Sequence, residues 1–349
     1  MKPDGVVQIV RRFGPVGGME TYVWRLTRAL RELGIPVRVI CETVHASVPQ
    51  GIEVHRLGSM ARRPRWLAAW RFSGRVSRFV SRHTWPGWLF HSHEATAVHQ
   101  VTTFHGPPFA RVLERPWWRR MSPRVWGSLL LERREVCGPQ VRCVVPNSVL
   151  IRQMLEDYYP CIGERMGPVI APGVDAFPRR RPRADVSEIV VGFAGREWRR
   201  KGLDRTVRIL RAWYSANPRV RLIVAGPSAS EVRHLFAHVP FEVSLLGDVD
   251  LHDFYARIDL LLHPARMEPF GMVVTEALSA GVPAVVSDQC GARSEVHPSC
   301  IVPEHAPVEQ WVQACERAIL HTGRVSYRRS WLDVAREHVA LYEQIDAQA

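Results

Sequence analysis

Residues 268–288 read EPFGMVVTEALSAGVPAVVSD, and they indicate how the second half of the chain is organised. The apolar segment DLLLHPA at 259–265 precedes them and has the composition of a buried strand, as does PAVVS at 283–287. Between these two segments, residues 271–280 are expected to form a helix. Apolar strands on both sides of a helix predict a parallel sheet whose two faces are covered.

The same alternation of strands and helices continues on both sides of this stretch. A first series begins at VVQIVRRF, passes through Gly17-Gly18 into a helix at 19–34, and returns as the strand PVRVICE. A second series begins with SEIVVGFAG, and its further elements are expected as helices at 203–216, near 230–238 and at 251–258, with strands at 220–226 and 241–247. The chain is therefore predicted to be α/β, with two Rossmann-like domains.

The length of the chain agrees with two domains, because 349 residues exceed the usual size of one hydrophobic core. The run RRRPR at 179–183 is charged, contains proline and has no periodicity, so we interpret it as a linker. The predicted domains are 1–178 and 184–325. The remaining residues, 326–349, are expected to form a helix that packs back on the first domain.

Two glutamates in the opening stretch are candidates for binding the hydroxyl groups of a ligand. Glu268 follows a strand, and Glu276 lies eight residues later inside the next helix. Phe270, Gly271 and Met272 would begin that helix, where free amides and the helix dipole favour anions. A diphosphate could rest on those amides, while Glu268 holds sugar hydroxyls and Glu276 holds ribose hydroxyls. The alternative is an amphipathic helix with two solvated carboxylates.

A second group of candidate residues lies in GFAGREWRRKGLDRTV, where a strand leads into a helix. Arg196 and Lys201 are five residues apart at the helix start and could clamp a diphosphate. A departing nucleotide diphosphate gains negative charge, which fixed cations would stabilise. Such a site needs no metal ion. Arg199 and Arg200 lie between the two and are expected to face solvent.

The first half of the chain contributes glycines and histidines. Gly17 and Gly18 would let the loop backbone approach donor phosphates or the acceptor closely. His105 follows the strand VTTF, where a neutral imidazole could donate or accept a hydrogen bond. His91 and His93 form an H-x-H pair whose rings would share one face of a strand. No distant carboxylate or cysteine cluster matches that pair, so we expect no metal site.

The pattern of these motifs resembles the GT4 family of retaining glycosyltransferases. The stretch from Glu268 to Glu276 is similar to the family's E-x7-E signature, and the stretch from Gly195 to Gly202 to its GR-x4-KG element. Gly17-Gly18 resembles the family's first loop, and His105 its central histidine. The resemblance covers most of the chain but is poor between residues 45 and 90.

The resemblance implies a GT-B fold, in which two Rossmann-like domains face each other across a cleft and the C-terminal helix crosses back to the N-domain. It implies retaining transfer of a hexosyl group from a nucleotide diphosphate sugar, with uridine as the default base and no cofactor. The residues implied in catalysis are His105, Glu268, Arg196 and Lys201. The residues implied in donor binding are Gly17, Gly18, Arg196, Lys201, Gly226, Val249, Glu268, Phe270, Gly271, Met272 and Glu276.

The net charge of +13 favours an anionic partner. Residues 61–82 carry seven arginines and no acid, and residues 115–126 form a second run of arginines and tryptophans. Such runs suit an anionic membrane surface or a phosphorylated glycan or glycolipid acceptor. The pattern around residues 259–291 also resembles bacterial lipopolysaccharide core glucosyltransferases. The acceptor is therefore expected to be an anionic glycan or glycolipid, with the lipopolysaccharide core as the specific candidate, and not nucleic acid.

The cysteines and the hydropathy bear on the location of the protein. The seven cysteines are scattered without a C-x-x-C pair, so no disulfide framework is expected and a reducing cytoplasm fits. No apolar run is long enough to span a bilayer, and no secretory signal is recognised. We therefore expect a cytoplasmic protein at the periphery of the inner face of the cell membrane.

Two other classes of function stay open. A GT-B epimerase or phosphorylase shares the expected fold, although no segment indicates the cofactor-bearing lysine of a phosphorylase. A basic protein that binds membranes or nucleic acid without transferase activity would share the positive charge. The basic runs, however, do not belong to a nucleic-acid-binding motif, and aromatic stacking motifs on a sheet are absent from the sequence.

Overall fold

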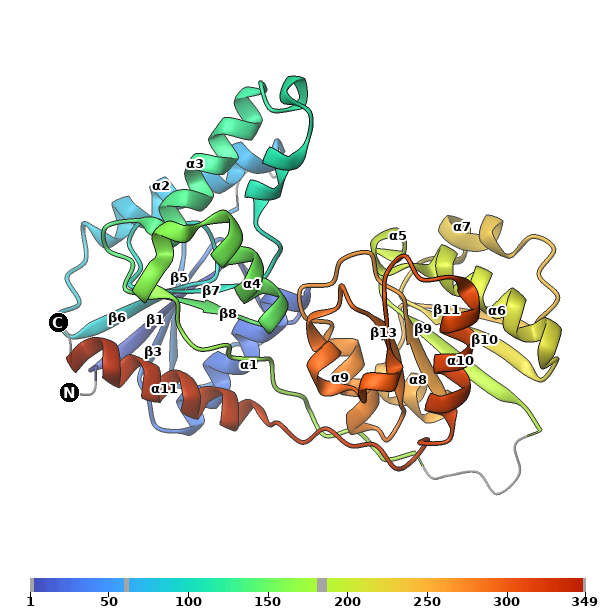
Figure 1. The fold of residues 1–349 in the computed structure, drawn as a ribbon. Coiled ribbons are helices and arrows are strands. Elements are labelled where there is room, and N and C mark those ends of the chain that lie inside the picture. Colours follow the sequence, from blue (N-terminus) through green and yellow to red (C-terminus); the bar gives the residue numbers. More distant parts are fainter. Residues whose placement is uncertain (1–2, 60–62, 181–186, 348–349) are drawn as a thin grey trace. The chain divides into compact units, whose positions relative to one another are not determined.

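The computed structural model describes residues 3–59, 63–180 and 187–347. The chain forms two compact units (Figure 1). The first unit combines Met1–Gly173 with Ser330–Ala349, and the second is Val174–Arg329. Each contains a six-stranded parallel sheet with helices, which confirms the prediction of two Rossmann-like α/β domains.

The sheet of the first unit has the strand order β5-β3-β1-β6-β7-β8. Strands β3 and β5 follow on one side of β1, and strands β6, β7 and β8 then follow on its other side. The strands are β1 (Gly5–Ile9), β3 (Val37–Cys41), β5 (Ile52–Arg56), β6 (Trp88–Ser92), β7 (Val101–Phe104) and β8 (Cys143–Pro146), with a separate pair formed by β2 (Arg12–Phe13) and β4 (Thr43–Val44).

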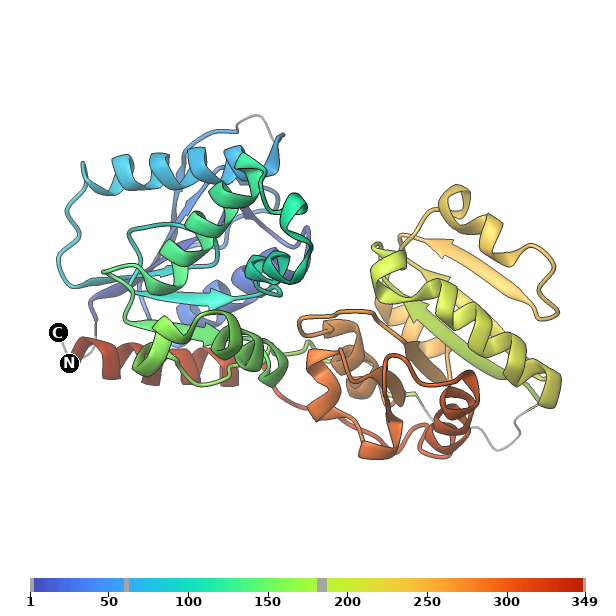
Figure 2. The same cartoon turned by 45° about the horizontal axis from the view of Figure 1, so that its top comes forward.

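Helices cover this sheet and bury their apolar sides. Those of the first unit are α1 (Gly18–Glu32), α2 (Arg65–Val80), α3 (Pro123–Cys137), α4 (Val149–Tyr158) and α11 (Trp331–Ala347), with 3-10 helices η1 (Phe109–Glu114), η2 (Trp117–Arg119) and η3 (Pro160–Arg165). Helix α1 buries Tyr22, Leu26 and Leu30, as its helical spacing predicts. Helix α11 packs against α1 in the first unit (Figure 2). The Tyr22 hydroxyl of α1 lies 2.9 Å from Nε2 of His338 in α11. The terminal helix therefore returns to the first unit, as predicted.

The sheet of the second unit repeats the same order, β11-β10-β9-β12-β13-β14. Its strands are β9 (Ile189–Ala194), β10 (Val220–Ala225), β11 (Val243–Gly247), β12 (Leu260–His263), β13 (Ala284–Ser287) and β14 (Ile301–Val302). Its helices are α5 (Trp198–Lys201), α6 (Leu203–Ala216), α7 (Ala229–Val232), α8 (Leu251–Arg257), α9 (Met272–Ser279) and α10 (Val308–Ile319), with 3-10 helices η4 (Arg233–Phe236), η5 (Gly291–Glu295) and η6 (Pro298–Cys300).

The helix expected near 230–238 is shorter than predicted. A capping box at Ser228 starts α7, which gives way to η4 after four residues. His238 then has a φ of 62°, a left-handed conformation that a continuing helix does not allow. The sequence does not indicate a positive φ at a residue other than glycine. The predicted helix therefore extends too far toward His238.

The run 179–183, interpreted as a linker, begins inside the second unit. Arg180 pairs with the buried Asp259, with Nη2 and Oδ1 2.6 Å apart, and this ion pair fixes the segment to the unit. The division of the chain falls after Gly173 and after Arg329. Residues 181–183 of the predicted linker lie outside the described residues.

The expectation of no disulfide is wrong. Cys137 at the end of α3 and Cys161 in η3 are joined by a disulfide bond, with their Cα atoms 6.2 Å apart. Packing of α3 against η3 brings the two together, and the two cysteines, 24 positions apart in the sequence, belong to no recognisable motif. Each free cysteine of the described residues is buried.

Among the described residues, no helix combines the length and the apolar character that crossing a bilayer requires.

Candidate functional site

The predicted donor residues of the second unit lie at one edge of its sheet. The direction of the strand order reverses between β9 and β12, and ligands of parallel sheets bind at the carboxyl ends of the strands beside such a reversal. Gly195 and Arg196 follow β9, Gly226 follows β10, and residues 264–271 follow β12. The topology therefore brings segments far apart in sequence to a place where a ligand can contact several loops.

Lys201 and Glu268 meet at this edge. Nζ of Lys201, at the end of α5, lies 3.4 Å from Oε2 of Glu268, a residue that is only 7% exposed. His263, buried at the end of β12, places Nε2 3.5 Å from the same oxygen. Burial by itself would raise the pKa of Glu268, but Lys201 and the other cationic neighbours outweigh it and hold that pKa well below its ordinary value. Glu268 is therefore ionised, and its charge is compensated.

Arg200 also belongs to this group, contrary to the expectation that it faces solvent. Its Nη1 lies 3.2 Å from Oε2 of Glu268 and donates to the carbonyl of Met267 at 2.7 Å. The turn of α5 directs Arg200 toward the loop after β12, while Arg199 stacks on the ring of Trp198. The direction of side chains in a four-residue helix depends on tertiary contacts, so the sequence did not show it.

Lys201 is one of only two lysines in a chain with 47 lysines and arginines; the other is Lys2. Its side chain packs over Gly195, where a Cβ atom would lie 2.2 Å from Cδ of Lys201. Gly195 has a φ of 143°, and Gly226 beside it has a φ of 112°. A compact ammonium group fits this confined position better than the broad guanidinium of arginine. The two glycines thus expose their backbone beside Lys201, which supplies one positive charge.

Gly271 begins α9 next to this surface. It has a φ of 100° and offers no side-chain cap to the helix. A Cβ atom at Gly271 would lie 3.0 Å from Sγ of Cys290 and 3.1 Å from Cγ of Glu268, so the loop and the helix start are closely packed. The first turn of a helix has backbone amides without intrahelical partners, and here Met272 begins that turn. These amides and Lys201 both favour an anion.

Phe270 helps to hold the loop before α9 in place. It is 4% exposed, and its carbonyl accepts a hydrogen bond from the amide of Ala292 at 2.7 Å. Phe270 therefore fixes the path of the chain from Glu268 into α9. The prediction that Phe270 starts the helix is displaced by two residues, because Gly271 is the N-cap.

Glu276 lies on α9, within hydrogen-bond distance of Tyr255. The Tyr255 hydroxyl is 2.9 Å from Oε2 of Glu276 and 3.0 Å from the carbonyl of Val273. Burial raises the pKa of Glu276, while Tyr255 and Lys201 oppose that rise. Lys201 thus acts electrostatically on both glutamates. Tyr255, like His263, was not identified from the sequence, because its role follows only from the packing of α8 beside α9.

Arg196 lies on the loop after β9, and Val249 lies on the loop after β11. The guanidinium of Arg196 pairs with Asp248 at 2.6 Å, and both side chains are mostly exposed. Val249 follows Asp248 in the loop after β11 and is half-buried. An exposed ion pair of this kind is weak. The structure therefore brings Lys201, but not the guanidinium of Arg196, to Glu268.

The first unit carries a chain of buried hydrogen bonds at the corresponding edge of its sheet. His93 follows β6 and His105 follows β7; Nδ1 of His93 lies 2.8 Å from Nε2 of His105. Nε2 of His93 lies 2.7 Å from the amide oxygen of Gln8, in β1. Because an amide oxygen only accepts, Nε2 of His93 donates, and its Nδ1 must accept from His105. This assignment leaves Nδ1 of His105 as a hydrogen-bond acceptor.

The histidines of this region are held neutral by burial. Burial lowers the pKa of His105 to about 3 and also lowers the pKa of His93. The rings of His91 and His93 are 4.3 Å apart, so they share one face as the H-x-H spacing predicts. His91 bonds to Tyr342 and Thr103. Among the residues that the structure describes, no group of three or more His, Cys, Asp and Glu residues is arranged to hold a metal ion.

Gly17 and Gly18 form the entry to α1. A Cβ atom at Gly17 would lie 2.4 Å from Oε2 of Glu20, which pairs with Arg12. Gly17 therefore makes room for Glu20 at the helix start. Gly18 has open space where a side chain would be. An approach of this loop to a ligand stays a prediction.

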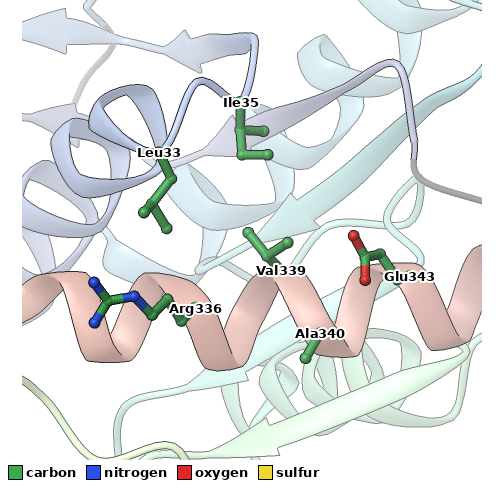
Figure 3. A pocket seen from close by; sticks show the side chains of 6 residues that line it. All are labelled: Leu33, Ile35, Arg336, Val339, Ala340 and Glu343. Atoms are coloured by element: carbon green, nitrogen blue, oxygen red, sulfur yellow. The ribbon is translucent and has the colours of Figure 1, made fainter.

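A separate pocket lies between the end of α1 and helix α11 (Figure 3). Its volume is about 300 Å³, and its lining comprises Leu33, Ile35, Arg336, Val339, Ala340 and Glu343. It contains none of the predicted site residues. The pocket follows from the packing of the two helices, and we assign it no role.

The pH dependence of stability tests whether a buried histidine such as His99 is neutral in the folded protein. Burial lowers its pKa to about 4, so the unfolded chain takes up a proton below pH 6.5 that the folded protein does not. Its contribution to stability is complete above pH 6.5 and is lost as the pH falls toward 4. Between pH 7.5 and pH 5, the free energy of unfolding should fall by about 2 kcal/mol more in the wild type than in His99→Gln.

Urea unfolding of both proteins at the two pH values measures this difference. Glu94 and Glu135, whose pKa values burial raises to about 7 and about 8, act in the opposite direction but are present in both proteins. Equal pH dependence of the wild type and His99→Gln would contradict a neutral, buried His99.

Matches to known protein families cover most of the chain. Residues 16–176 match the family described as Glycosyltransferase Family 4, and residues 188–321 match the one described as Glycosyl transferases group 1. The second match contains Lys201, Glu268 and Glu276, and the first contains His105.

Two curated relatives illustrate the similarity. The chain is 29% identical over 234 residues to the phosphatidylinositol N-acetylglucosaminyltransferase GPI3 subunit of Saccharomyces cerevisiae, covering 61% of this chain and 48% of that protein. It is 26% identical over 353 residues to the D-inositol 3-phosphate glycosyltransferase of Thermobispora bispora, covering 85% and 80%. The chain thus spans about half the length of the first of these relatives.

Solved structures share the fold of the whole chain. WaaG, a glycosyltransferase involved in lipopolysaccharide biosynthesis, matches with a TM-score of 0.75 and 18% identity over 98% of both chains. Anabaena HepE in complex with UDP and glucose matches with a TM-score of 0.63 and 17% identity over 99% of this chain and 97% of that one. The GT-B fold is therefore confirmed, and the chain belongs to glycosyltransferase family 4.

Proposed function

We propose that this protein transfers a hexosyl group from a nucleotide diphosphate sugar, with uridine as the base, to an anionic glycan or glycolipid. The observation that carries this proposal is the position of Lys201, which acts on both Glu268 and Glu276 beside the start of α9. This arrangement joins one cation and free amides for phosphate with two carboxylates for hydroxyl groups.

The diphosphate would bind the amides of the first turn of α9 and the ammonium of Lys201. In the free protein that ammonium is paired with Glu268. When the donor binds, the phosphate takes over part of this pairing, and the ionised Glu268 is free to accept hydrogen bonds from sugar hydroxyls. Glu276 would accept from the ribose in the same way. Arg196 would join the phosphate only after leaving Asp248.

In the proposed reaction, the bond between the anomeric carbon and the phosphate oxygen breaks, and a bond from that carbon to the acceptor oxygen forms. The acceptor hydroxyl gives its proton to the departing phosphate oxygen, on the same face of the sugar, so the anomeric configuration is retained. Lys201 stabilises the charge that develops on the leaving diphosphate, and no metal ion is required. His105 would orient the sugar through Nδ1.

Several observations support the nucleotide and the acceptor class. The HepE structures contain UDP, and the names of the two curated relatives specify phosphatidylinositol and inositol 3-phosphate. A phosphorylated acceptor also suits the net charge of +13. Lipopolysaccharide core is the specific acceptor that we propose, at the inner face of the cell membrane.

Thermal unfolding with UDP-, GDP- and ADP-glucose tests donor binding. We expect UDP-glucose to raise the Tm of the wild type, and Glu276→Ala to lose this shift because the ribose contact is gone. The matched control is Glu316→Ala, an exposed glutamate on α10, which should keep the full shift. A full shift in Glu276→Ala would show that the donor binds elsewhere.

The stereochemistry of the product tests the reaction separately. NMR of the product formed from an α-linked donor should show an α-linkage, and a β-linkage would contradict retention. Release of sugar that depends on inorganic phosphate would instead identify a phosphorylase.

A further inference from the structure

One segment of the first unit exposes most of the protein's large apolar side chains. Of the eight exposed large hydrophobic residues among those described, six lie between positions 113 and 130. They come from η1, the segment around η2, and α3, which extends away from the sheet of its unit (Figure 1). We call this set the tryptophan surface: Leu113, Trp117, Trp118, Met121, Trp126 and Leu130.

The side chains of the tryptophan surface have few contacts that would occupy them within the chain. Trp117 and Trp118 are 65% and 62% exposed, and their rings pack edge to face on each other with centroids 6.1 Å apart. Met121 is 66% exposed and Trp126 57%. Single exposed apolar residues are common, but a concentration of this kind marks an interaction surface.

Arginines surround these apolar side chains. The span from 113 to 130 holds four arginines, at 115, 119, 120 and 124, and a single acid, Glu114. Glu114 bonds to the hydroxyl of Tyr158. Arg115, Arg119 and Arg124 are exposed. The surface therefore combines a positive rim with indole rings and flexible apolar chains.

The other basic aromatic run, 61–82, has a different role. In α2, Nε1 of Trp70 donates to the carbonyl of Gly127 at 2.9 Å, and the guanidinium of Arg134 lies over the Trp70 ring. A Cβ atom at Gly127 would be 3.0 Å from the ring of Trp66, so this ring also packs on α3. Two aromatic rings of α2 thus fix α3 in place, and the outward tryptophans belong to the second run alone. Ala61 and Arg62 of the first run lie outside the described residues.

We infer that the tryptophan surface docks into the interface of an anionic lipid bilayer. Indole rings prefer the depth of the lipid headgroups, and arginines beside them pair with anionic headgroups. Leu113, Met121 and Leu130 would enter the acyl boundary, a position that nucleic acid does not offer. This inference deepens the proposed function, since a lipid-linked acceptor requires the protein to reach a membrane.

Sedimentation of the full-length chain with vesicles tests the inference. We expect binding to vesicles of phosphatidylglycerol and phosphatidylcholine, and at least 10-fold weaker binding to phosphatidylcholine alone. The double variant Trp117→Ser/Trp118→Ser should lose at least 10-fold in affinity for the anionic vesicles. Arg119→Glu/Arg124→Glu should show a similar loss, and added salt should weaken wild-type binding. Brominated lipid should quench tryptophan fluorescence in the wild type more than in the double variant.

The matched control is Val149→Ser/Leu320→Ser, which removes the other two exposed large apolar side chains of the described residues and should bind as the wild type does. The Tm shift by UDP-glucose should be unchanged in every variant, which shows that they are folded and separates this inference from donor binding. Equal vesicle binding by the tryptophan variant and the wild type would overturn the inference. Binding to oligonucleotides or self-association without vesicle binding would overturn it as well.

Discussion

Replacing Lys201 with methionine is expected to lower kcat/KM for hexosyl transfer by about 100- to 1,000-fold, the usual cost of removing one group that stabilises developing charge. Methionine keeps an apolar chain over Gly195 but removes the ammonium that acts on Glu268 and Glu276. Initial rates with UDP-glucose and a lipid-linked acceptor measure the change.

Two further variants make the Lys201 prediction specific. Lys201→Arg keeps the charge, yet the side chain is only 15% exposed and packed on Gly195, so a guanidinium should restore little activity. Arg199→Met removes an exposed cation of the same helix, whose guanidinium lies over Trp198, and should change kcat/KM by less than about threefold. If Lys201→Met were as active as Arg199→Met, Lys201 would have no part in transfer.

Glu268→Gln is expected to separate donor binding from reaction. Glu268 competes with phosphate for Lys201 and Arg200, with oxygen-to-nitrogen distances of 3.4 and 3.2 Å in the free protein. Without its charge, UDP should bind about 10-fold more tightly, because Lys201 then lacks the anion that pairs with it, whereas Arg200 keeps Glu197 at 2.6 Å. Transfer should nevertheless slow by about 100-fold or more, because glutamine holds the sugar hydroxyls less strongly.

The same variant should be less stable without ligand. Removing one partner of a buried ion pair leaves unpaired charge, but Arg200 is 35% exposed, so we expect a loss of about 2 kcal/mol in the free energy of unfolding. Calorimetric titration with UDP and urea unfolding measure the two effects. Weaker UDP binding by Glu268→Gln than by the wild type would contradict the proposed competition.

The sequence predicts the fold well because the strands of a covered parallel sheet are continuous apolar runs. Segments such as IVVGFA and DLLLHPA admit few other interpretations. It also predicts that Lys201, Glu268, Gly271 and Glu276 gather, since each follows or lies near the carboxyl end of a strand in one sheet. Topology alone then places them at the same edge.

The remaining features depend on packing that no local pattern encodes. Arg200 points to Glu268 because of the turn of α5, and Tyr255 reaches Glu276 because α8 lies beside α9. The disulfide between Cys137 and Cys161 likewise follows from the contact of α3 with η3. The sequence also could not separate the inward tryptophans of α2 from the outward ones around η2, because both runs have the same composition.

The most direct test of the central claim uses the scarcity of lysine in this chain. Lys201 and Lys2 are the only lysines, so peptide mass spectrometry after amine acylation reports on each without ambiguity. If a nucleotide diphosphate is held by Lys201, saturating UDP should slow acylation of Lys201 by at least about 10-fold, while UMP protects much less and Lys2 reacts at an unchanged rate. Equal acylation of Lys201 with and without UDP would contradict the account.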